Sequence, residues 1–83
     1  MPRYFFDIQD GTTLRDNEGL ELPDVDAVRV EAHRALAELA MQAPLGNGAV
    51  QIRADVRDSG GAYVLSATLL LVSEVAVGEP KDG

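Results

Sequence analysis

The feature that most constrains the fold is one helical pattern placed between two pairs of strand patterns. From Val25 to Ala43, apolar side chains recur at spacings of three and four residues, so they share one face of a helix. Asp24 precedes this pattern and can cap the free amides of the first turn. The apolar face consists of Val25, Val28, Ala32, Ala35, Leu36, Leu39 and Ala43. Such a helix needs a sheet to cover that face.

The flanking segments supply the sheet. Asp10-Gly11 and the Asp58 to Gly61 segment are typical hairpin turns, and alternating or β-branched residues run on both sides of each turn. The four predicted strands are Arg3 to Gln9, Thr12 to Arg15, Ala49 to Arg57 and Tyr63 to Val72. The order ββαββ predicts an α+β fold, with a four-stranded, mainly antiparallel sheet in strand order 2-1-3-4 and one long helix on one face. We expect a single domain over residues 1–77 and a flexible tail over residues 78–83.

Size and composition exclude several classes of protein. A chain of 83 residues has room for one core, and the absence of cysteine excludes disulfides, thiolate nucleophiles and cysteine-based zinc sites. A net charge of −7 disfavours direct binding to nucleic acid. The start of the chain lacks the apolar run of a signal peptide, and no segment approaches the roughly 20 apolar residues that span a membrane. We expect a cytoplasmic protein without membrane contact.

Acidic residues are concentrated near the N-terminus, where Arg15 is the only basic residue between Asp7 and Asp26. The acidic residues of this run are Asp7, Asp10, Asp16, Glu18, Glu21, Asp24 and Asp26. The run is either a solvated edge or a surface that attracts a basic partner or a cation. It lacks the ligand spacing of a calcium loop, so the sequence predicts no metal site.

No residue set in the sequence indicates catalysis. His33 is the only histidine and lies beside the apolar stripe, and no hydroxyl residue lies in a nucleophile-elbow motif. The short glycine turns lack the strand-to-helix context and the lysine of a phosphate-binding loop. We therefore expect no enzyme, no catalytic residue and no cofactor.

Four short motifs together resemble those of a known family. They are the start Met1 to Phe6, the Asp10-Gly11 turn, the loop Asp16 to Gly19 and the Glu21 to Asp24 segment before the helix. Residues 1–72 resemble short bacterial proteins that consist of a domain of unknown function, a resemblance that implies no activity. Many relatives have a histidine where this chain has Asp7. A looser similarity links the chain to small antitoxin domains of the HicB type.

These observations leave three functional hypotheses. The first is a non-enzymatic binding or regulatory module that acts through protein–protein contacts. The alternative is a HicB-type antitoxin-like regulator that neutralises a basic partner with its acidic edge. The third is a small hydrolase, which would need a pocket with convergent polar groups.

The strand patterns also predict an interaction surface, because one helix covers only one face of the sheet. If Tyr4 and every second residue after it in the first strand face the helix, Phe5 lies on the open face. The same argument applied to the last strand places further apolar side chains there. The predicted surface consists of Phe5, Val64, Leu70 and Val72. We expect a second copy to cover it in a homodimer, unless the segment from Ser73 to Val77 folds back over it.

Overall fold

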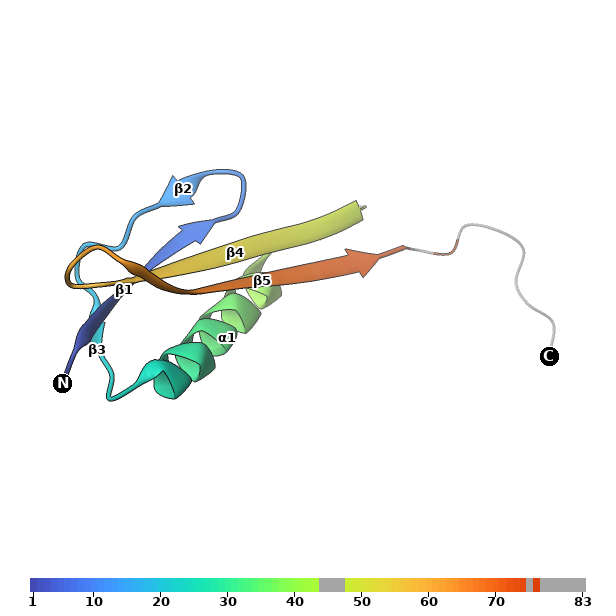
Figure 1. Ribbon diagram of the computed structural model, residues 1–83. Helices are drawn as coiled ribbons and strands as arrows, with labels where there is room; N and C mark the ends of the chain where they lie inside the picture. Colours follow the sequence, from blue (N-terminus) through green and yellow to red (C-terminus); the bar gives the residue numbers. More distant parts are fainter. Residues whose placement is uncertain (44–47, 75, 77–83) are drawn as a thin grey trace.

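A computed structural model describes residues 1–43, 48–74 and 76, and shows one antiparallel sheet with one helix packed on it (Figure 1). The predicted α+β fold is confirmed. The elements are β1 (Arg3–Gln9), β2 (Thr13–Leu14), β3 (Leu20–Glu21), α1 (Val25–Gln42), β4 (Gly48–Asp58) and β5 (Tyr63–Ser73). The whole predicted tail, residues 78–83, lies outside the described residues, as do Val75 and Val77 of the segment that would cover the sheet in the alternative to a dimer.

The strand order is β2-β1-β4-β5, which confirms the predicted order of the four main strands. The sequence analysis missed β3, a two-residue strand that pairs Arg3 with Glu21 and Tyr4 with Leu20. Its pairing is extended by a hydrogen bond of 3.0 Å from the N–H of Leu22 to the carbonyl of Pro2. Two residues are too few to give an alternating pattern, so β3 is defined by its contacts with β1 rather than by its sequence.

Helix α1 begins where the sequence predicts and ends one residue earlier. The Asp24 carboxylate accepts a hydrogen bond of 2.9 Å from the N–H of Ala27, which satisfies one free donor of the first turn. Asp26 adds negative charge near the positive end of the helix dipole. At the other end, Ala43 has left the helical conformation but still donates its N–H to the carbonyl of Ala40.

The core lies between α1 and the face of the sheet that α1 covers. One cluster joins Tyr4, Val28 and Val56, and the other joins Leu36, Ile52 and Ala54. The members therefore come from β1, α1 and β4, and the alternation of β4 places all its buried residues on the helix side. Figure 1 shows that the hairpin of β4 and β5 extends beyond the end of α1, so its distal part is less covered.

A bulge between β4 and β5 corrects one prediction from the sequence. Val56 pairs with Leu65 and Arg57 pairs with Tyr63, so Val64 is an extra residue in β5. Because the extra residue interrupts the alternation, both Val64 and Leu65 pack against the cluster of Tyr4, Val28 and Val56. Val64 is therefore part of the core side and not of the open face, where strict alternation had placed it.

The packing of α1 predicts a clear ranking of variants. Leu36→Ala should destabilise the protein by about 2 to 4 kcal/mol, because the Leu36 side chain is only 2% exposed and its loss leaves a cavity. Leu39→Ala should cost less, since Leu39 is only half-buried. Arg34→Ala is the control, because Arg34 is exposed and its pairs with Glu31 and Glu38 lie at the surface. Urea unfolding that ranks Arg34→Ala as the most damaging change would contradict this packing.

Candidate functional site

The segment between β2 and β3 forms an unusually wide bulge against β1. Ile8 pairs with Leu14 and Tyr4 pairs with Leu20, so the five loop residues 15–19 lie opposite only the three β1 residues 5–7. β2 and β3 therefore behave as one edge strand that is interrupted by a loop. This loop contains the Asp16 to Gly19 motif, which contributed to the family resemblance.

At this interruption, the Asp16 side chain makes a hydrogen bond to β1 that a paired strand would otherwise make. Its Oδ2 accepts a hydrogen bond of 3.0 Å from the N–H of Phe6, a donor on the edge of β1. Its Oδ1 accepts hydrogen bonds from the N–H groups of Glu18 and Gly19, at 3.0 and 3.1 Å. One carboxylate thus satisfies the strand edge and also fixes the turn of the loop. An aspartate is suited to this role because its short side chain offers two acceptor oxygens close to the backbone.

Asp16 also belongs to an ionic group that we call the anchoring cluster: Asp7 from β1, Asp16 from the loop and Arg57 from β4. The Arg57 Nε lies 3.0 Å from the Asp7 Oδ2, and the Arg57 Nη2 donates to the Asp16 carbonyl at 2.7 Å. The Asp16 N–H donates to the Asp7 Oδ1 at 3.0 Å. Asp7 is only 5% exposed, so its charge depends on these partners.

The electrostatics of the anchoring cluster favour the ionised carboxylates. Burial raises the pKa of Asp7, but the hydrogen bonds from Arg57 and from the Asp16 N–H, together with the charge of Arg57, outweigh it and hold this pKa below its usual value. Burial likewise raises the pKa of Asp16, and the N–H groups of Phe6, Gly19 and Glu18 more than compensate. Both groups are therefore charged structural acceptors at neutral pH and are poorly suited to hold a catalytic proton.

The anchoring cluster covers Phe5, the first residue of the predicted interaction surface. The Arg57 guanidinium carbon lies 4.7 Å from the centre of the Phe5 ring, within cation–π distance. Gly19 packs on the ring edge so closely that a Cβ atom at this position would lie 2.8 Å from Phe5. Phe5 is half-buried as a result. The structure thus brings together residues that the sequence analysis did not connect. The available signal in the sequence was a charged residue within the first strand, Asp7, followed by the motif Asp16 to Gly19.

Of the four residues predicted to form the interaction surface, two are exposed. Leu70 and Val72, near the end of β5, have exposed fractions of 62% and 59%. Between them and Phe5 the open face is polar, because Asp55 accepts hydrogen bonds from Gln9, Arg53 and Ser66. The exposed part of the predicted surface therefore lies near the end of β5.

Part of the acidic run is used inside the fold. Asp7 pairs with Arg57, Asp16 fixes the loop, and Asp24 caps α1. Glu21 lies 3.6 Å from Arg3, although both side chains are about half exposed. Asp10, Glu18 and Asp26 are exposed. The concentration of acidic residues in the sequence therefore reflects capping and anchoring to a large extent.

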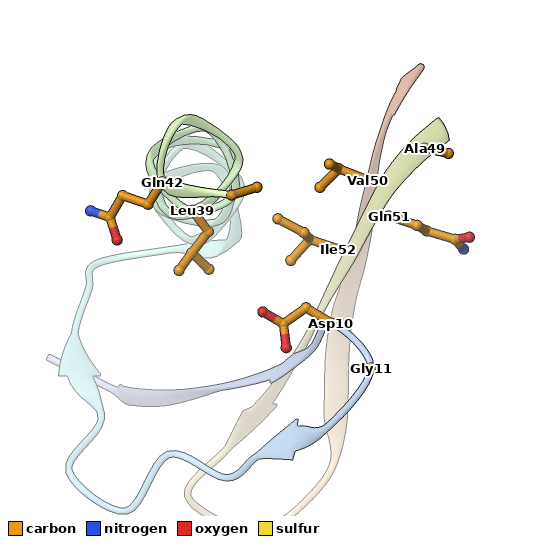
Figure 2. A pocket seen from close by; sticks show the side chains of 9 residues that line it. Asp10, Gly11, Leu39, Gln42, Ala49, Val50, Gln51 and Ile52 are labelled. Carbon is orange, nitrogen blue, oxygen red and sulfur yellow. The ribbon is translucent and has the colours of Figure 1, made fainter. Parts of the chain in front are cut away.

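The cavities give little indication of chemistry. One cavity, of about 640 Å³, is open and lies between the C-terminal end of α1, the start of β4 and the β1–β2 turn. Figure 2 shows Leu39 and Ile52 on its two sides and the Asp10 carboxylate near the turn. One carboxylate among aliphatic and amide side chains does not define a catalytic site. In the described part of the chain, no three histidine, aspartate or glutamate side chains could hold a metal ion. No helix there is both long and apolar enough to cross a membrane.

A second groove, of about 310 Å³, lies between α1 and β5. It is lined by His33 and Leu36 from the helix and by residues 66–69 of the strand. His33 is exposed on the flank of α1 and has none of the hydrogen bonds that would orient an imidazole as a base among the described residues. The groove borders the outer edge of the sheet, because β5 is the last strand in the order β2-β1-β4-β5.

The anchoring cluster predicts a large effect of Arg57. Arg57→Met should destabilise the protein by about 3 to 5 kcal/mol, because it leaves the buried Asp7 carboxylate without its counter-charge. Arg53→Met is the matched control on the same strand: Arg53 is about half exposed, and its ion pair should contribute at most about 1 kcal/mol. Equal losses in denaturant unfolding would show that the cluster does not anchor the fold.

The same cluster predicts acid sensitivity. Since the folded-state pKa values of Asp7 and Asp16 lie below the ordinary value of 3.8, their stabilisation is complete well above that pH. It is lost as the pH falls below 3.8 through the lowered folded-state values, when protons bind to the unfolded chain first. Asp7→Asn should therefore reduce stability at neutral pH and flatten its decline in acid. Unfolding curves with unchanged pH dependence would contradict the assignment.

Gly19 provides a local test of the loop. Its φ of +73° lies in the left-handed region, and a Cβ would lie 2.9 Å from the Tyr4 carbonyl oxygen as well as close to Phe5. Gly19→Ala should therefore destabilise the protein by more than about 1 kcal/mol. Gly11→Ala, also at positive φ but with no atom near the added Cβ, should cost less. A thermal unfolding midpoint lowered equally by both changes would argue against close packing of Gly19.

Comparison with known proteins supports the resemblance that the four motifs indicated. No curated protein and no solved structure matched the chain. The model of one family, described as a domain of unknown function (DUF6894), matches residues 3–70. This range runs from the start of β1 into β5, and includes the loop Asp16 to Gly19 and all residues of the anchoring cluster. Because the match covers most of the chain, the protein belongs to the DUF6894 family.

Proposed function

We propose that the protein is a small non-enzymatic module that acts through protein–protein contacts, and that the outer edge of β5 is its contact surface. The observation that carries this proposal is an eleven-residue strand, Tyr63–Ser73, that ends the sheet and pairs on one side with β4. Among the described residues, no strand pairs with its other side. Such an edge offers a row of backbone donors and acceptors to another chain.

The direction of these backbone groups follows from the pairing pattern. The N–H of Phe6 points to Asp16, away from β4, so Phe6 and its β4 partner Val56 form a non-hydrogen-bonded pair. The N–H and C=O of Val56 must then point to β5, and those of its β5 partner Leu65 point back to β4. Alternation along β5 directs the backbone groups of the intervening residues outward. These residues are Ser66, Thr68, Leu70 and Val72.

The composition of β5 supports the same proposal. Between Tyr63 and Ser73 there is no proline, lysine, arginine, aspartate or glutamate. Natural proteins commonly use such residues to prevent unwanted pairing at sheet edges. The end of the strand also carries Leu70, Leu71 and Val72, whose exposed fractions are 62%, 49% and 59%. An edge without protective residues, beside exposed apolar side chains, favours a binding role.

The two other hypotheses have less support. A HicB-type antitoxin-like regulator would attract a basic partner through acidic residues, but Asp7, Asp16 and Asp24 already serve the fold. A hydrolase would use convergent polar groups in a pocket, whereas the cavity of about 640 Å³ carries one carboxylate. We keep the cytoplasm as the proposed location and propose no direct binding to nucleic acid, because the net charge is −7.

A proline at an outward-facing position tests the role of the β5 edge. Thr68→Pro removes an N–H that does not bond to β4, so the fold should survive while pairing with any added strand is lost. Thr68→Ala keeps this N–H and is the matched control. In extracts of cells that produce the tagged chain, the wild type and Thr68→Ala should elute in an assembly larger than the chain, and Thr68→Pro should elute as a monomer.

Circular dichroism and thermal unfolding of the purified variants show whether Thr68→Pro remains folded. If the folded proline variant stays in the same assembly as the wild type, β5 is not the contact surface. If all three chains elute as monomers, the proposed function fails.

A further inference from the structure

We propose that the chain which pairs with β5 is a second copy of this protein, and that the two β5 strands run antiparallel about a two-fold axis at Leu69. This inference rests on the proposed function, because it uses the same edge, and it adds the identity of the partner and the register of pairing. In such a symmetric dimer, the β5 edge of each copy pairs with the β5 edge of the other, so neither edge is left open to a third chain.

Charge does not oppose a second copy at this edge, and it does not draw a basic partner there. The net charge of −7 makes two copies repel each other over most of their surfaces. Residues 65–73 carry no charge, so antiparallel pairing of this segment with itself places no like charges opposite each other. A basic protein would instead be drawn to the exposed acidic residues, such as Asp10 and Asp26, which lie on other elements.

The backbone fixes a small number of allowed registers. Outward-pointing residues must oppose outward-pointing residues, because each such pair exchanges two hydrogen bonds. With Leu69 on the axis, Thr68 opposes Leu70 of the second copy, and Ser66 opposes Val72 of the second copy. The four outward residues of each chain form about eight backbone hydrogen bonds. This register pairs every residue from 65 to 73 and stops before the bulge at Val64.

The groove between α1 and β5 selects this register among the allowed ones. Ala67 is the small residue in the groove, between His33 and Leu36 on one side and the strand edge on the other. Leu71 lies on the same face of β5 as Ala67 and is 49% exposed, because it extends beyond the cover of α1. With the axis at Leu69, Leu71 of each copy lies opposite Ala67 of the other. Each groove of about 310 Å³ therefore receives one exposed leucine.

The first test measures mass by light scattering coupled to size exclusion at micromolar concentration. The wild-type protein should show twice the mass of one chain. Leu71→Glu should show the mass of one chain, because the introduced carboxylate would be buried in the groove of the second copy. Val30→Glu is the matched control: Val30 is 68% exposed on α1, and the change adds the same charge. It should remain dimeric. A folded Leu71→Glu variant that stays dimeric would overturn the proposal.

The second test examines the register and does not depend on the stability of Leu71→Glu. The chain has no cysteine, so a single introduced thiol forms a disulfide only with its copy. Leu69→Cys should give a disulfide-linked dimer in air, because a residue on the axis faces itself at a Cα separation of about 4.5 Å. Val72→Cys should not cross-link: its two copies are six residues out of register, about 20 Å apart.

The combined outcomes separate this inference from the proposed function. A disulfide-linked Val72→Cys dimer with an unlinked Leu69→Cys variant would overturn the register. A wild-type chain that is monomeric when pure, but whose assembly in extracts is lost in Thr68→Pro, would overturn self-association and leave β5 as a contact surface for another protein. A monomer in both settings would overturn both proposals.

Discussion

The interaction on which the arrangement of this protein depends is the buried pair of Asp7 and Arg57, together with the loop that Asp16 attaches to it. Arg57 lies on β4 and Asp7 on β1, so their 3.0 Å contact fixes two neighbouring strands relative to each other. The Arg57 Nη2 donates a hydrogen bond to the Asp16 carbonyl, and the Asp16 carboxylate accepts one from the N–H of Phe6 on the edge of β1. A buried pair of this kind is costly to desolvate, and the accompanying backbone hydrogen bonds offset that cost.

This arrangement explains how a single helix suffices for a sheet of this size. Helix α1 covers one face, where the buried side chains of β1 and β4 meet Val28 and Leu36. On the opposite face, the loop over residues 15–19 and Arg57 cover Phe5, and the hydrogen bonds of Asp55 satisfy the polar centre. Near β1, both faces of the sheet are therefore covered by other parts of the chain or satisfied by hydrogen bonds. The exposed aliphatic side chains of β5, Leu70, Leu71 and Val72, lie at the other end of the sheet.

The local patterns of the sequence predict the helix, the four main strands and their order. The predictions of the helix and of the individual strands succeed because each depends on residues close together in the chain, such as the cap at Asp24 or the alternation in β4. The anchoring cluster could not be predicted in this way, since Asp7 and Arg57 are fifty positions apart and meet only after the sheet forms. The error at Val64 has a related cause: one extra residue in β5 is invisible to an alternation argument, because the pairing strand defines it. Of the four residues predicted to form the interaction surface, Phe5 and Val64 are partly buried, and Leu70 and Val72 are exposed.

The two edges of the sheet differ in a way that bears on function. The β1 edge is covered within the chain by β2, by β3 and, between them, by the Asp16 carboxylate, which accepts a hydrogen bond from the N–H of Phe6. The β5 edge is longer, uncharged and unpaired among the described residues. In this chain, the loop that closes the β1 edge uses a glycine in the left-handed region and a buried ionic cluster. An unprotected edge favours pairing with other chains, and the open cavity beside the end of α1 carries one carboxylate, which is why we propose β5 as the contact surface.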